Sequence, residues 1–241
     1  MDRAGQRRQE AGQGATGPVR SFAALALGLI LLLALVAGLV LPWAGVVAGP
    51  AVLALVAGVA LRGMASGYPH ARMGACNAVT LIRAALTAGL VSVLVASGDS
   101  GWALVAVAAA ALLLDGVDGW LARREGLVSA FGARFDMEVD ALLALVLALL
   151  GIAAGKAGLW LLLLGGLRYA YGAAGVFLPW LQGDLPPRRT RKAVCVIQIA
   201  TLIALLAPPV VPPLSLGLAG IATALLVWSF AVDILWLWRR R

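Results

Sequence analysis

The sequence has little charge and almost none of the residues that serve soft-metal or redox chemistry. Charged residues make up 12% of the 241-residue chain, about half the roughly 25% of an average soluble domain. One histidine (His70) and two widely separated cysteines (Cys76 and Cys195) are present. These scarcities exclude a soluble globular enzyme and a Cys/His metal centre, and the 62% hydrophobic content excludes disorder. An integral membrane protein remains.

Apolar runs account for most of the chain, and eight of them are long enough, or nearly so, to cross a bilayer as helices. They lie near residues 21–41, 45–63, 76–97, 102–123, 130–153, 157–178, 192–208 and 214–238. We therefore predict an all-α, polytopic membrane helix bundle. Basic residues gather at both ends and in every second turn, so the positive-inside rule places both termini in the cytoplasm. An even number of spans satisfies that placement.

Acidic residues are concentrated in one stretch, although carboxylates inside a membrane segment are costly. Six of the 11 lie within 26 residues: Asp115, Asp118, Glu125, Asp136, Glu138 and Asp140. The first two are three residues apart and Asp136 and Asp140 are four apart, so each pair shares a helix face. In an antiparallel hairpin around the turn near residue 127, the two pairs also match in depth. Four carboxylates can therefore converge near the cytoplasmic interface.

Four close carboxylates repel one another and require compensating positive charge. Oxygen-only ligands suit Mg²⁺ or Mn²⁺, and Mg²⁺ held by few carboxylates usually also binds substrate phosphates. Small residues at positions 119, 122 and 132 lie on the acidic faces and leave room for a ligand, although helix packing would also explain them. Arg123 can bind phosphate or simply anchor the turn.

The spacing D-x2-D-G-x2-A-R-x8-G-x3-D-x3-D resembles the signature of the CDP-alcohol phosphotransferase (CDP-alcohol phosphatidyltransferase) family. Every position is met, by Asp115, Asp118, Gly119, Ala122, Arg123, Gly132, Asp136 and Asp140. The resemblance implies that a CDP-linked lipid reacts with a hydroxyl acceptor and that CMP leaves. It also implies a homodimer and a six-helix catalytic core, which we map to residues 76–241. The remaining parts are then a disordered cytoplasmic tail (1–20), two additional membrane helices (21–63) and a cytoplasmic linker (64–75).

The same resemblance assigns roles to individual residues. Two divalent ions, Mg²⁺ or Mn²⁺, would be held by Asp115, Asp118, Asp136 and Asp140. Asp140 would also be the catalytic base, which agrees with its greater depth in the hairpin. The CDP-lipid would contact Asn77, Thr80, Gly119, Ala122, Arg123, Ser129 and Gly132, although Asn77 could also be a plain helix N-cap.

The signature does not choose the acceptor, which in the family can be glycerol 3-phosphate, serine, inositol phosphate, phosphatidylglycerol or an aminoalcohol. Cations outside the signature favour an acceptor with its own phosphate, and glycerol 3-phosphate is our first expectation. The candidate acceptor residues are Arg83, Arg168, Arg191 and Lys192. Snorkelling of Arg83 and a positive-inside role for the later cluster remain the alternatives. We expect Asp233 to pair with the arginines that end the chain.

The sequence thus favours a phosphatidyltransferase of phospholipid biosynthesis that uses CDP-diacylglycerol. Its active site would face the cytoplasm, its membrane would be a bacterial inner membrane, and it would have no nucleic-acid partner. A cation or proton transporter with the acidic hairpin as its pathway is the alternative class, and a structural scaffold is a third. Transporters typically carry internal repeats and midplane sites, whereas this chain has no visible repeat and its acids lie toward one interface.

Overall fold

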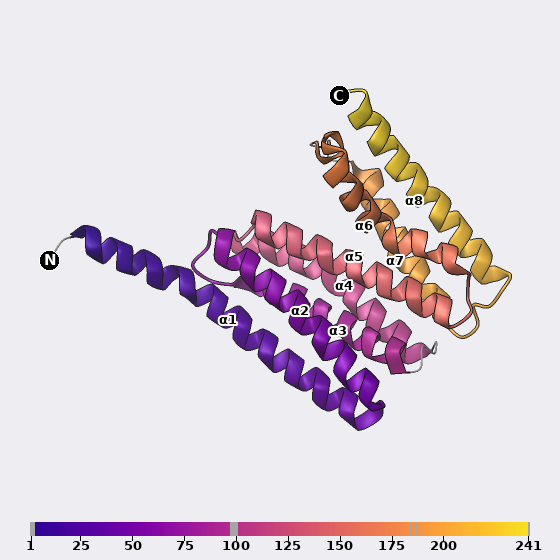
Figure 1. Cartoon of the computed structure of the whole chain (residues 1–241), viewed down its shortest axis with the longest axis horizontal. Helices are drawn as coiled ribbons and strands as arrows, with labels where there is room; N and C mark the ends of the chain where they lie inside the picture. Colours follow the sequence, from indigo (N-terminus) through magenta and orange to yellow (C-terminus); the bar gives the residue numbers. More distant parts are fainter. Residues whose placement is uncertain (1–2, 97–100, 184, 187, 241) are drawn as a thin grey trace. The chain divides into compact units, whose positions relative to one another are not determined.

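The computed structural model describes residues 3–96, 101–183, 185–186 and 188–240 (Figure 1). Over these residues the chain is helical and contains no strand, which confirms the predicted all-α class. The α-helices are α1 (Arg3–Val40), α2 (Trp43–Gly67), α3 (Gly74–Ala96), α4 (Trp102–Glu125), α5 (Ala130–Ala153), α6 (Leu162–Phe177), α7 (Arg189–Leu205) and α8 (Leu214–Trp238). Two short 3-10 helices, η1 (Leu159–Leu161) and η2 (Pro179–Gln182), flank α6.

Six helical segments of the described chain are long and apolar enough to cross a membrane. They are Gly17–Val40, Trp43–Gly67, Gly74–Ala96, Trp102–Glu125, Leu159–Phe177 and Leu214–Trp238. The two remaining predicted spans correspond to α5 and α7. α5 carries three carboxylates in its first half, and α7 has only 17 residues. That these two helices also cross the membrane stays a prediction.

α1 begins at Arg3 and runs without a break into the first apolar span. Alanine, arginine, glutamine and glutamate make up ten of the residues 3–16 and favour helix, although three glycines and one threonine lie among them. Pro18 lies inside the helix and does not end it. Helix that is stabilised by the apolar span therefore extends back through the polar segment.

The chain divides into two compact units. Unit 1 comprises Met1–Ser97 and Ala110–Val139. Its apolar core combines side chains of the first two helices, such as Phe22 and Leu53, with Leu81 of α3 and Phe135 of α5. α2 packs closely on α3, and α1 contacts both (Figure 1). The two N-terminal helices are thus part of the core that supports the later helices of this unit.

Glycine makes the close approach of α2 to α3 possible. A Cβ built on Gly49 would lie 2.6 Å from the Ala88 carbonyl oxygen and even closer to the Ser92 hydroxyl. Any side chain at position 49 would therefore push the two helices apart. Gly45, one turn earlier, has a similar relation to α3, with its Cβ position 2.7 Å from the Ser92 carbonyl oxygen.

Unit 2 comprises Gly98–Ala109 and Asp140–Arg241. Within it α7 packs on α8, and η2 contacts both α6 and α8. The amine of Lys156 is buried at the end of α7, where it donates to the carbonyl oxygens of Ala207 (3.2 Å) and Val210 (2.9 Å). The Ser215 hydroxyl donates in turn to the Lys156 carbonyl oxygen (2.6 Å). Lys156 thereby joins the α5–α6 and α7–α8 connections and satisfies carbonyls at a helix C-terminus.

Candidate active site

A pocket of about 320 Å³ opens in unit 1 between α3, the end of α4 and the start of α5. All seven residues predicted to contact the CDP-lipid line it: Asn77, Thr80, Gly119, Ala122, Arg123, Ser129 and Gly132. Asp118 and Asp136 also belong to its wall. Residues of α3 and of the α4–α5 region, up to more than 50 positions apart in the sequence, therefore surround one cavity whose wall includes two carboxylates.

The turn between α4 and α5 shapes one wall of this pocket. α4 ends where Gly126 adopts a positive φ of 66°, and the Leu127 N–H then bonds back to the Ala122 carbonyl oxygen (3.0 Å). Such a left-handed glycine after the last helical turn is a common helix stop. Ser129 starts α5 as its N-cap, because its hydroxyl accepts from the Gly132 N–H (3.0 Å).

The start of α3 is held against the same turn by a contact that sequence reasoning missed. Glu125 Oε2 accepts from the Ala75 N–H (3.0 Å) and so caps the N-terminus of α3 from the end of α4. Gly74 precedes that bond with a φ of 76°, and a Cβ there would collide with Leu127. The sequence signal for this contact was Glu125, an acid of the cluster that the signature does not use.

Three of the four predicted metal ligands come together. One carboxylate oxygen each of Asp115, Asp118 and Asp136 lies within 4.8 Å of the others. Asp118 is buried, whereas Asp115 and Asp136 keep 24% and 36% of their side-chain surface exposed. The matched depths expected for the α4–α5 hairpin agree with this grouping. Asp140 lies one helical turn beyond Asp136 on α5, in unit 2, and its share in a metal site stays a prediction.

Arg83 is the centre of this carboxylate group. Its guanidinium, 1% exposed, forms ion pairs with Asp115 (3.0 Å), Asp118 (2.7 Å) and Asp136 (2.5 Å). Its Nε also donates to the Ala111 carbonyl oxygen of α4 (3.1 Å). Arg83 is one of the predicted acceptor contacts, and in the structure its guanidinium is bonded to three candidate metal ligands. The available signal was the three-residue spacing of Asn77, Thr80 and Arg83, which puts them on one face of α3.

The donor set fits a hard divalent cation. Three carboxylates and one guanidinium leave two negative charges, and carboxylate oxygen is the ligand type that Mg²⁺ and Mn²⁺ prefer. The Thr80 hydroxyl donates to Asp118 Oδ2 (3.0 Å) and fixes the direction of that carboxylate. These residues could therefore hold a metal ion at the edge of the pocket that we expect to receive phosphates.

The remaining acceptor candidates lie in unit 2. Arg168 is exposed on α6, and Lys192 is exposed on α7. Arg191 forms a two-point ion pair with Asp233 of α8 (2.8 and 3.0 Å), and Arg188 adds a third contact at 3.3 Å. Asp233 thus pairs with arginines at the start of α7 rather than with Arg239 or Arg240, because α7 packs alongside α8.

One comparison with known proteins gives a match, and it covers most of the chain from α3 onward. No curated protein and no solved structure gives a significant match. A family model, CDP-alcohol phosphatidyltransferase, matches residues 73–235, which is about two thirds of the chain and includes the whole pocket and the carboxylate group. The match begins at residue 73, just before α3. The chain therefore belongs to the CDP-alcohol phosphatidyltransferase family.

Proposed function

We propose that this membrane transferase moves a phosphatidyl group from CDP-diacylglycerol to a hydroxyl acceptor and releases CMP, as a step of phospholipid biosynthesis. The observation that supports it most is the pocket whose wall combines the seven expected CDP contacts with Asp118 and Asp136. The reaction needs this combination, because a nucleotide must be held while the charge of its pyrophosphate is balanced beside it.

In the proposed reaction the acceptor oxygen attacks the phosphorus on the lipid side of the pyrophosphate. The bond from that phosphorus to the bridging oxygen breaks, and CMP leaves with that oxygen. The acceptor proton passes to the Asp140 carboxylate, which acts as general base. Asp115, Asp118, Asp136 and Asp140 would hold two divalent ions, Mg²⁺ or Mn²⁺. When bound, the ions neutralise the pyrophosphate and the charge that develops on the leaving oxygen.

The protein residues orient the donor substrate. Gly119, Ala122 and Gly132 line the pocket with small side chains or none and so leave space for phosphates, while Arg123 supplies a charge that can bind them. Asn77 and Thr80 present polar groups from the first turns of α3. From the positive-inside pattern we propose that this site faces the cytoplasm, and the membrane that we propose is a bacterial inner membrane. The family resemblance is the basis for proposing a homodimer.

Glycerol 3-phosphate is the proposed acceptor. An anionic acceptor that approaches several carboxylates needs basic residues beyond the metal ions. The acceptor contacts that we propose for this role are Arg168, Arg191 and Lys192. Arg83 is the fourth predicted acceptor contact, and its burial among aspartates makes it the weakest of the four. Serine, inositol phosphate, phosphatidylglycerol and aminoalcohols are the other acceptors to test.

Purified protein in lipid nanodiscs, supplied with Mg²⁺, CDP-diacylglycerol and each acceptor in turn, tests the proposal by CMP release. We expect release with glycerol 3-phosphate and none in excess chelator. Arg168→Ala should raise the acceptor KM and leave the KM for CDP-diacylglycerol nearly unchanged. Release with non-phosphorylated alcohols alone would reject the acceptor, and no release with any acceptor would reject the transferase activity.

A further inference from the structure

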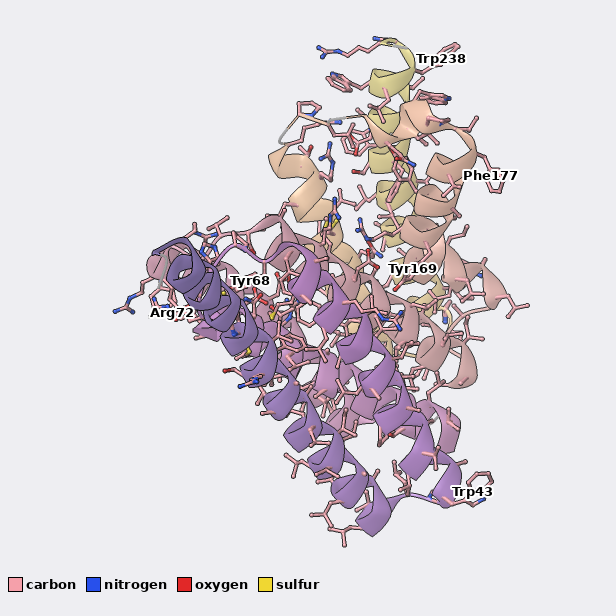
Figure 2. All side chains as sticks on the ribbon, turned by 60° about the vertical axis from the view of Figure 1, so that its left-hand side comes forward. Trp43, Tyr68, Arg72, Tyr169, Phe177 and Trp238 are labelled. Carbon is pink, nitrogen blue, oxygen red and sulfur yellow. The ribbon has the colours of Figure 1, made fainter. Side chains whose placement is uncertain are left out.

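Tyr68 lies outside the family match, yet its hydroxyl contacts a residue of the nucleotide pocket. The residue caps the C-terminus of α2, where its N–H donates to the Met64 carbonyl oxygen (3.1 Å). Its phenol oxygen lies 3.0 Å from Asn77 Nδ2 and 2.9 Å from the Met73 carbonyl oxygen. Figure 2 shows Tyr68 and Arg72 at one end of the α1–α2 pair and Trp43 at the other. A residue that directly follows α2 therefore bonds to a side chain of the pocket wall.

The hydrogen bonds of Asn77 fix the orientation of its amide. Nδ2 donates to the Met73 carbonyl oxygen (2.5 Å) and to the Tyr68 hydroxyl. A main-chain carbonyl can only accept, so the amide nitrogen must face it. The opposite atom, Oδ1, then points toward α5, where it lies 3.5 Å from the position of a Cβ built on Gly132. Asn77 therefore presents an acceptor to the pocket that it lines.

Tyr68 itself is held by packing on the pocket's outer wall. Its ring meets Phe131 of α5 edge-on, with the ring centroids 5.6 Å apart, and meets His70 at 5.3 Å. His70 Nε2 lies 3.3 Å from the carbonyl oxygen of Val128, in the turn before α5. Burial raises the pKa of the Tyr68 phenol, so the hydroxyl stays protonated at neutral pH and can donate and accept at once.

Asn77 lies in the first turn of α3, before the residues of that helix that meet the carboxylates. Arg83, which meets the carboxylates, is six residues further on, or roughly 9 Å along the helix axis. Thr80 lies between them and bonds to Asp118. If the pyrophosphate lies beside the aspartates, the nucleoside extends along α3 toward Asn77.

We propose that Tyr68 is a positioning residue that locks the Asn77 amide with its oxygen toward the nucleoside of the CDP substrate. This proposal rests on the function proposed above. The oxygen accepts from a nucleoside donor, which is either the exocyclic amine of cytosine or a ribose hydroxyl. Without the Tyr68 hydroxyl the amide loses one of its two fixed contacts and its orientation becomes less defined. The N-terminal hairpin then contributes to nucleotide affinity although it lies outside the family core.

Tyr68→Phe tests this with minimal disturbance, because the ring contacts with Phe131 and His70 are kept. We expect the Kd of CMP and the KM for CDP-diacylglycerol to rise by about three- to tenfold, the effect of one lost hydrogen bond. The kcat at saturation and the acceptor KM should not change. Tyr171→Phe is the matched control, since it also removes a phenol bond to a main-chain carbonyl, that of Leu181 (2.9 Å), but in unit 2.

Two further measurements identify how Tyr68 acts. In an Asn77→Ala background, Tyr68→Phe should cause no additional loss, because the residue through which it acts is gone. Comparison of CMP with UMP as ligands separates the two donors: a loss for CMP alone identifies the base amine, and an equal loss for both identifies the ribose.

Unchanged CMP affinity in a stably folded Tyr68→Phe protein would overturn the proposal, as would an equal loss in the Asn77→Ala background. If the wild-type enzyme releases CMP, either of these variant results leaves the proposed function intact. Absence of CMP release by the wild type itself would instead reject the function.

Discussion

At the scale of single residues, Arg83 determines how the carboxylate group is balanced before a metal ion arrives. Its guanidinium contacts one oxygen each of Asp115, Asp118 and Asp136, the three carboxylates that a divalent ion could also bind. The arginine and the ion therefore compete for the same ligands. A buried positive charge beside the site also lowers its affinity for any cation.

Arg83→Gln should therefore bind Mn²⁺ more tightly, by about tenfold or more, because a neighbouring positive charge is removed. In the absence of metal the variant should be less stable, with a Tm lower by roughly 5 °C or more, since its carboxylates then lack a counter-charge. Mn²⁺ titration followed by electron paramagnetic resonance, and thermal unfolding with and without Mn²⁺, measure both effects. Arg62→Gln, at an exposed position of α2, is the control. Weaker or unchanged Mn²⁺ binding would contradict the competition.

Asp140→Asn concerns the proposed base. The amide keeps the shape of the carboxylate but cannot take a proton, so kcat should fall by roughly 10²–10⁴ while CMP binding largely survives. Steady-state CMP release and CMP titration give the two numbers. Glu138→Gln makes the same chemical change at an exposed position of α5 and should keep nearly full activity. Near-normal turnover in Asp140→Asn would show that another group accepts the proton.

Helical periodicity made the aspartates predictable but not their partner. Residues that share a helix face and a depth must come close in a short hairpin, so Asp115, Asp118 and Asp136 could be grouped from spacing alone. Arg83 lies on a different helix, and hydropathy does not say which buried charge a membrane arginine will meet. The same limit applies to Asp233, whose partners at the start of α7 depend on how α7 packs on α8.

At the scale of helices, the contact of α2 with α3 sets the frame of the pocket. α3 carries Asn77, Thr80 and Arg83 on one side and packs against α2 through Ala88 and Ser92. The run lengths in the sequence predicted both helices to within a few residues. Their close packing depends on two glycines that a composition count cannot distinguish from the others.

Gly49→Ala should lower the stability of the protein, by about 1–3 kcal/mol, because the new methyl group collides with main chain of α3. Gly58→Ala, on the same helix, has no atom within 4 Å of its added carbon and should leave stability unchanged or raise it. Thermal unfolding in one detergent compares the two. Equal behaviour of the variants would mean that α2 and α3 are not in close contact.

At the scale of the whole molecule, the boundary of the family match is not a boundary of the fold. Phe22, Leu53 and Met64 of the N-terminal helices belong to the same apolar core as Leu81 and Phe135 of the matched region. The sequence predicts these helices as an addition to the signature-bearing part, and no pattern in it indicates the shared core. Side-chain contacts between segments far apart in the sequence determine whether two parts share a core, and local hydropathy patterns do not reveal such contacts.

A fragment of residues 73–241 should therefore be unstable, although it contains the whole family match. We expect poor recovery from membranes and loss of CMP release. Co-expression with a fragment of residues 1–72 should restore part of both, because the core can then re-form. A fragment as stable and active as the full chain would show that the hairpin is dispensable.

Because its amine is buried, Lys156 can serve as a natural probe of local unfolding in unit 2. Lys156 and Lys192 are the two lysines of the chain, and only Lys192 is exposed. A reagent that acylates amines should therefore modify Lys192 quickly, and Lys156 only when the α7–α8 connection separates from it. The ratio of the two labels, read by mass spectrometry, would then follow local unfolding at that end of unit 2 without any engineered probe.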